Sequence, residues 1–99
     1  MKTIEQIRAI LRAEKPYLQE RYGVTEIGVF GSYIRNEQTP ASDIDILIEL
    51  EEPPRISLLD LVNLEGYLSA RLGAKVQTAI KKNLKPRLKP YILQEVEML

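Results

Sequence analysis

The chain has 99 residues, with no cysteine and no histidine, and its 14 basic and 14 acidic residues give a net charge of zero. Disulfides, zinc sites and Ser/His or Cys/His catalysis are therefore excluded, and any metal must be held by oxygen ligands, which favours Mg²⁺, Mn²⁺ or Ca²⁺. The balanced charge argues against stable nucleic-acid binding, and no apolar run approaches the ~20 residues that cross a bilayer. We expect one domain over residues 1–99, cytoplasmic and without a membrane partner.

The N-terminal part of the sequence predicts a helix and then a buried strand. Thr3 and Gln6 have capping-box spacing, Pro16 is expected to kink or restart the helix, and Gly23 to end it. The apolar positions that follow one helical face are Ile4, Ile7, Ile10, Leu11, Tyr17, Leu18 and Tyr22. Residues 24–30 are rich in β-branched side chains and predict a short strand.

The middle of the chain predicts a short helix opened by Gly31-Ser32, a polar loop over 36–42 and a strand over 43–50. After Pro53-Pro54, Ser57 and Asp60 predict a second capping box. The buried side of that helix is expected to comprise Leu58, Leu61, Val62, Leu64, Leu68 and Leu72.

Gly73 is expected to end this helix, followed by a strand over 75–80 and a final helix near 91–96. Short strands separated by helices indicate a small α/β or α+β domain, with a mixed sheet flanked by helices.

Basic residues cluster in the last third of the chain. Six of them, with no acidic residue between Gly73 and Gln94, are Lys75, Lys81, Lys82, Lys85, Arg87 and Lys89. A solvated surface and a basic wall for phosphate or an acidic partner are both compatible with this pattern.

The paired acids Asp43 and Asp45 are the main candidates for chemistry. Side chains two apart on a strand point the same way, so these carboxylates should project together while Ile44 and Ile46 enter the core. Adjacent carboxylates repel each other unless a cation compensates them, and a hard divalent ion bridging a triphosphate would do so. A bare Asp-x-Asp is more often a solvated pair at a strand edge.

The Gly31-Ser32 pair lies upstream, directly after an apolar strand. Backbone N–H groups at such a turn can point at an anion, glycine permits close approach, and the serine hydroxyl adds a donor. Arg35 is positioned to reach a phosphate oxygen, although it is equally compatible with an ordinary surface arginine. Each of these features is weak alone.

Taken together, F-G-S-Y-I-R followed by S-D-I-D-I-L-I-E resembles the signature of the DNA polymerase β superfamily, and most closely its minimal nucleotidyltransferases. The resemblance extends over nearly the whole chain. It implies transfer of a nucleoside monophosphate from a triphosphate, with Gly31, Ser32 and Arg35 binding the nucleotide. It also implies that Asp43 and Asp45 are catalytic and ligate Mg²⁺, two ions being expected.

Related domains carry a third aspartate on the next strand, where this sequence has Gln77. A neutral amide cannot act as a base. The enzyme is then weakened or inactive, another group such as Glu49 or Glu65 substitutes, or the position aligns differently.

The resemblance further implies the antitoxin of a HEPN/MNT toxin–antitoxin module, which transfers AMP from ATP to a tyrosine of the HEPN ribonuclease toxin. The alternative is a catalytically impaired binding module that neutralises its partner by contact. Transfer to a small-molecule hydroxyl is a third possibility.

Overall fold

The computed structural model describes residues 1–99 and begins with a long helix, α1 (Ile4–Tyr22). The predicted capping box is confirmed: the Thr3 side chain accepts from the Gln6 N–H, and the Gln6 side chain accepts from the Thr3 N–H. The helix continues through Pro16 without restarting, and Gly23 ends it in the left-handed conformation with φ 71°.

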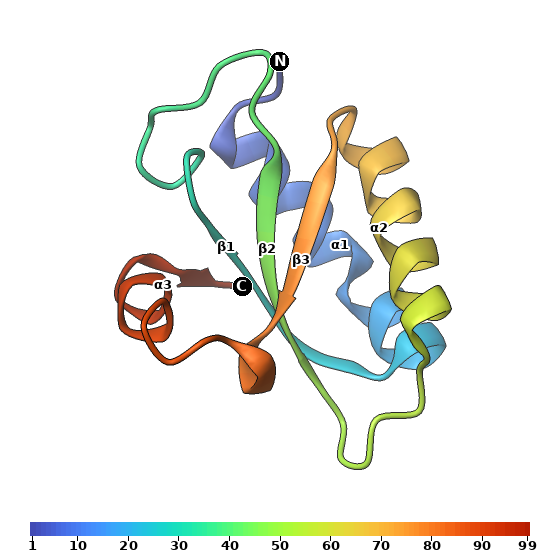
Figure 1. Ribbon diagram of the computed structural model, residues 1–99. Helices are drawn as coiled ribbons and strands as arrows, with labels where there is room; N and C mark the ends of the chain where they lie inside the picture. The colour runs from blue at the N-terminus through green and yellow to red at the C-terminus, as the bar shows by residue number, and fades with distance from the viewer.

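The chain then forms a four-stranded mixed sheet in the order β3-β2-β1-β4. Strand β1 (Val24–Phe30) pairs antiparallel with β2 (Ile44–Leu50), and β2 pairs parallel with β3 (Val76–Ile80). A short strand β4 (Glu97–Met98), absent from the sequence prediction, pairs antiparallel with β1. The first three strands form the centre of the molecule in Figure 1.

The second long helix, α2 (Leu58–Leu72), connects β2 to β3. Its predicted start and end are confirmed, because Ser57 and Asp60 form a capping box and Gly73 is left-handed with φ 68°. Its predicted buried face was partly wrong: Leu58 and Val62 are 78% and 55% exposed. At 3.6 residues per turn, Val62 lies roughly 120° around the helix from the stripe that reaches the sheet. That stripe consists of Leu61, Leu64, Leu68 and Leu72.

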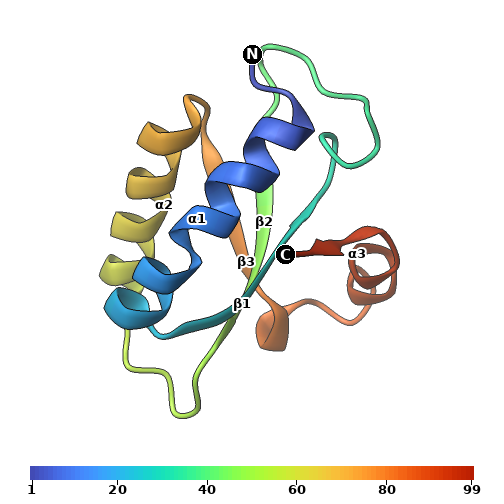
Figure 2. The same ribbon diagram turned by 180° about the vertical axis from the view of Figure 1, so that it is seen from behind.

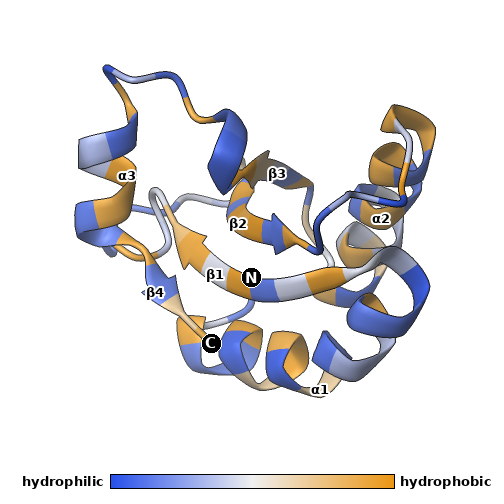
Figure 3. Cartoon of the chain, turned by 90° about the horizontal axis from the view of Figure 1, so that it is seen from below, coloured by the Kyte–Doolittle hydropathy of each residue, from blue (hydrophilic) through white to orange (hydrophobic).

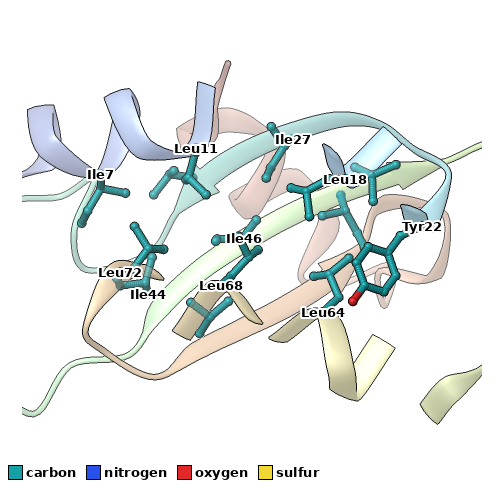
Figure 4. Close-up of a cluster of buried hydrophobic side chains, with 14 of the residues drawn as sticks. Ile7, Leu11, Leu18, Tyr22, Ile27, Ile44, Ile46, Leu64, Leu68 and Leu72 are labelled. Carbon is teal, nitrogen blue, oxygen red and sulfur yellow. The ribbon is translucent and has the colours of Figure 1, made fainter. Parts of the chain in front are cut away.

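The main core lies between these two helices and one face of the sheet (Figures 2 and 4). Ile44, Ile46 and Ile48 of β2 point into it, as their alternation predicted, together with Ile27 and Val29 of β1. The intervening side chains of β2 therefore face the other side of the sheet.

The segment that ends in α3 lies on the other side of the sheet from α1, and the C-terminus then returns to α1 (Figure 3). A 3₁₀ turn, η1 (Lys81–Asn83), leads to α3 (Lys89–Glu95), which corresponds to the predicted final helix and starts slightly earlier. None of the helices combines the length and the apolar character that a bilayer span requires.

Candidate active site

Asp43 and Asp45 lie at the beginning of β2. Asp45 is the second residue of the strand and Asp43 directly precedes it, and both are half-buried. The alternating positions Ile44 and Ile46 are buried at 1% and 0% exposure on the helix-covered face, so Asp45 belongs to the opposite face. This is the alternation that the sequence predicted.

Gly31 begins a tight turn directly after β1. The N–H groups of Ile34 and Arg35 both donate to the Gly31 carbonyl at 3.1 Å, and the Glu37 N–H donates to the Ser32 carbonyl at 2.9 Å. The predicted short helix is therefore only a turn. It stops because Asn36 adopts a left-handed conformation with φ 58°, which an α-helix cannot propagate.

The turn and the aspartates meet at Gly31. Asp45 is in register with Phe30 across the β1–β2 ladder, which brings its side chain over the next residue, Gly31. A Cβ built on Gly31 would collide with Oδ2 of Asp45 and lie 3.0 Å from its Cγ. Gly31 also has φ 82°, a conformation that other residues rarely adopt. The site therefore needs glycine here for two separate reasons.

Arg35 lies at the same turn and carries two carboxylate partners. Its Nε donates to Glu37 at 2.8 Å, and its Nη1 donates to the two oxygens of Glu95 at 3.0 and 3.1 Å. These hydrogen bonds, first Glu37 and then Glu95, raise the pKa of Arg35. The predicted nucleotide-binding residues are thus close together, and the guanidinium that could contact phosphate is held by carboxylates of the chain itself.

Glu95 is the residue that the sequence reasoning missed. Its Oε2 accepts from the Gly31 N–H at 2.7 Å in addition to contacting Arg35. It lies 64 positions after Gly31, at the end of α3. Its one visible signal is that it is the first acidic residue after the long basic stretch that follows Gly73.

The electrostatics of the site favour a cation. Burial raises the pKa of Asp45, and the negative charge of Asp43 raises it further, while Arg35 lowers it and Glu95 raises it. Two carboxylates that repel each other in a half-buried position are stabilised by a divalent ion. Their hard oxygen donors fit Mg²⁺, which commonly binds one or two carboxylates plus substrate phosphates. No group of three or more carboxylates could hold a metal by itself.

Gln77, which the resemblance places at the position of a third carboxylate, lies on the strand beside Asp45. Gln77 is in parallel register with Asp45 on the neighbouring strand β3, so the two share one face of the sheet. A carboxylate at this position would extend the acidic pair. The amide that is present adds an oxygen without charge.

Two other acidic residues, Glu49 and Glu65, were candidates to substitute for the third carboxylate. Neither lies beside the aspartate pair. Glu65 accepts from the N–H and hydroxyl of Thr78 at 2.7 and 2.8 Å, on the face opposite to Gln77. Glu49 shares the face of Asp45 but is four residues further along, about 13 Å at 3.3 Å per residue. It pairs instead with Lys81 at 3.8 Å.

The basic residues do not form a single wall at this site. Lys81, Lys82 and Lys89 line a hollow of about 580 Å³ at the other end of β2, together with Glu49 and Glu52. Lys82 pairs with Glu52 at 3.1 Å. Arg35, by contrast, lies at the Gly31 turn.

The class of this protein follows from comparison of the chain with known families. Residues 11–99 match the family described as "Nucleotidyltransferase domain". The chain belongs to this family and is a nucleotidyltransferase.

Two relatives are similar to the chain over nearly their full length. It is 50% identical over 96 residues to the protein adenylyltransferase MntA of Thermococcus cleftensis, covering 97% of this chain and 95% of that one. It is also 50% identical over 97 residues to a chain of Methanocaldococcus jannaschii whose name places it among protein adenylyltransferases, covering 98% and 94%.

Solved structures share the fold. One of a minimal nucleotidyltransferase superposes with a TM-score of 0.80 at 35% identity, covering 99% of this chain and 97% of the other. A toxin–antitoxin structure with AMP-PNP superposes with a TM-score of 0.69 at 21% identity, covering 95% and 69%. The second likeness is one of fold.

Proposed function

We propose that the chain is an antitoxin that transfers AMP from ATP to a tyrosine of a HEPN-domain toxin in the cytoplasm, with Mg²⁺ as the metal. The observation that carries the proposal is the packing of Asp45 against Gly31, because it joins a carboxylate pair and an anion-binding turn in one site. Relatives named protein adenylyltransferases support a protein acceptor. A fold shared with a toxin–antitoxin structure supports a toxin partner.

The reaction consists of attack by the acceptor oxygen on the α-phosphorus of ATP. A new P–O bond to AMP forms as the bond to pyrophosphate breaks, and the hydroxyl proton is lost to a base or to solvent. Two Mg²⁺ ions are expected, and when bound they would supply charge neutralisation at the phosphates and alignment of the attacking and leaving oxygens. Asp43 and Asp45 would hold the metal. The Gly31 N–H, the Ser32 hydroxyl and Arg35 would hold phosphate oxygens.

Gln77 supports a second candidate function, that of a binding module which neutralises its partner by contact. It lies beside Asp45, where the resemblance implies a carboxylate, and an amide cannot accept the acceptor's proton. In that case neutralisation of the toxin requires contact with the surface of the domain but not AMP transfer.

Labelling separates the two candidates. Wild-type protein is incubated with labelled ATP, Mg²⁺ and a HEPN-domain protein that carries the R-x₄₋₆-H motif. The enzyme proposal predicts label on a partner tyrosine, and loss of both label and neutralisation in the double variant Asp43→Asn, Asp45→Asn. A contact antitoxin would tolerate both changes. Absence of label with wild type, while the toxin is still neutralised, would remove the enzyme proposal.

A further inference from the structure

The carboxylate of Glu95 occupies the donors at the Gly31 turn. Its Oε2 lies 2.7 Å from the Gly31 nitrogen, and its two oxygens lie 3.0 and 3.1 Å from Nη1 of Arg35. These are the distances of charge-assisted hydrogen bonds. A carboxylate and a phosphate present similar anionic oxygens, so Glu95 makes the contacts expected of a bound phosphate.

Glu95 and a triphosphate cannot both accept a hydrogen bond from the Gly31 N–H at the same time. The amide has a single hydrogen, which makes one well-aligned bond, and a second anion at this spot would meet the charge of Glu95 at close range. The side chain of Glu95 is 24% exposed, so little solvent screens that repulsion. Occupation by one anion therefore excludes the other.

Helix α3, which carries Glu95 as its last residue, is lightly held. Helix α3 has seven residues and none of them is buried, and Tyr91 is 72% exposed. The following strand β4 is held separately, by pairing with β1 and by the ion pair of Glu97 with Arg8. Withdrawal of Glu95 needs only rotation of its side chain or a small shift of α3, neither of which breaks the main core between α1, α2 and the sheet.

We propose that Glu95 is an internal occupant of the phosphate site and competes with the nucleoside triphosphate for Gly31 and Arg35. This inference rests on the proposed function, because it takes that turn as the triphosphate site. Each binding event would include displacement of Glu95, which weakens nucleotide affinity and links the site to the position of α3 and β4. The competing interpretation, in which Glu95 supplies the carboxylate missing at Gln77, predicts loss of transfer rate when Glu95 is neutralised.

The first test compares two charge-neutralising variants by calorimetry with Mg²⁺ and ATP, and separately with inorganic triphosphate. Glu95→Gln should bind each ligand about tenfold more tightly than wild type, equivalent to about 1.4 kcal/mol. Glu37→Gln is the matched control, because Glu37 also bonds Arg35, at 2.8 Å, but leaves the Gly31 N–H untouched. It should change affinity by less than about twofold, well below the expected Glu95 effect.

The second test observes Gly31 directly. The chain has five glycines, so selective ¹⁵N-glycine labelling gives five amide signals. The Gly31 signal should shift in ligand-free Glu95→Gln and, in wild type, on addition of Mg²⁺ and ATP. The Gly66 signal, from an open position on α2, should stay in place.

The outcomes separate the two proposals. If wild type binds ATP and Glu95→Gln binds it equally, with the Gly31 signal unmoved, the inference about Glu95 is overturned and the proposed function stands. If Glu95→Gln binds ATP as wild type does but loses transfer rate, Glu95 acts in the chemistry and the competition is refuted. If neither wild type nor Glu95→Gln binds ATP or triphosphate, both proposals fail.

Discussion

The Asp45 carboxylate lies against the α-carbon of Gly31, so close that a Cβ on Gly31 would collide with it. Strand pairing of Phe30 with Asp45 produces this contact, because it places the residue after β1 beside the beginning of β2. The positive φ of Gly31 then turns the chain away from the carboxylate. One pair of residues therefore connects the candidate phosphate-binding turn with the candidate metal site.

Gly31→Ala should disturb both the turn after β1 and the position of the Asp45 carboxylate. The left-handed backbone is strained for alanine, which costs about 1–3 kcal/mol of folding stability, and the new methyl group displaces Asp45. We expect a lower midpoint in urea and loss of Mg²⁺-dependent ATP binding by calorimetry.

Gly66→Ala is the matched control for that substitution. Gly66 lies inside α2, and an added Cβ would meet nothing within 4 Å. Alanine should therefore stabilise the helix, by about 0.5–1 kcal/mol, and leave ATP affinity unchanged. Equal destabilisation by both substitutions would contradict the role given to the Gly31–Asp45 contact.

Asp45→Asn should stabilise the metal-free protein while it abolishes AMP transfer. The folded-state pKa of Asp45 is raised by burial and by Asp43, so ionised Asp45 opposes folding at neutral pH, and this cost diminishes as pH falls through that pKa. A neutral side chain removes the cost. Urea unfolding without Mg²⁺, at pH 7 and at pH 4, should show a larger gain from the substitution at pH 7.

Asp60→Asn should destabilise the protein at neutral pH, whereas Asp45→Asn should stabilise it. The pKa of Asp60 is lowered by hydrogen bonds from the Ser57 backbone and hydroxyl, so its charge favours folding above its ordinary pKa. Destabilisation by Asp45→Asn under the same conditions would show that the acidic pair is not repulsive.

Local chemistry allowed much of the fold to be predicted. The two capping boxes, at Thr3 and at Ser57, depend on residues three positions apart, and the alternation of Ile44 with Asp45 depends on strand geometry alone. Asp43, Asp45 and the Gly31 turn were singled out by their spacing together with the family resemblance, and the structure brings Asp45 and Gly31 together. The turn was mistaken for a short helix although Asn36 marked its end, because asparagine is among the residues that adopt the left-handed conformation most readily.

Features that depend on distant contacts could not be predicted. Strand β4 exists only because Met98 pairs with Gly28, and Glu95 joins the site only because α3 returns toward Gly31. Leu58 and Val62 were wrongly placed in the core. The apolar pattern of a helix shows which side faces the sheet, but not how far around the helix the buried face extends.

Gln77→Asp should increase the rate of Mg²⁺-dependent AMP transfer, by about tenfold or more if a general base is restored, since such bases contribute ~10²–10⁴-fold. The substitution places a third carboxylate in register with Asp45, so the metal-free protein should be less stable. Gln77→Asn, which has the shape of aspartate without its charge, is the control and should show neither effect. Transfer that stays at the wild-type rate in Gln77→Asp would indicate that the missing carboxylate does not limit the reaction.

The ion pair between Arg8 and Glu97 should make the folding stability of the protein depend on pH. The Arg8 guanidinium donates to both oxygens of Glu97, with Nη2 to Oε1 at 2.8 Å, and so attaches β4 to α1. Hydrogen bonding from Arg8 lowers the folded-state pKa of Glu97 below its ordinary value of 4.5. The pair therefore contributes its full stability above pH 4.5 and loses it as pH falls through the lowered pKa.

Urea unfolding should show that Glu97→Gln destabilises the protein at pH 7 but has little effect at pH 2. Glu5→Gln, which removes a 75% exposed partner of Arg8 at 3.8 Å, should change little at either pH. An equal loss from Glu97→Gln at both pH values would mean that packing of β4, rather than its charge, holds it to α1.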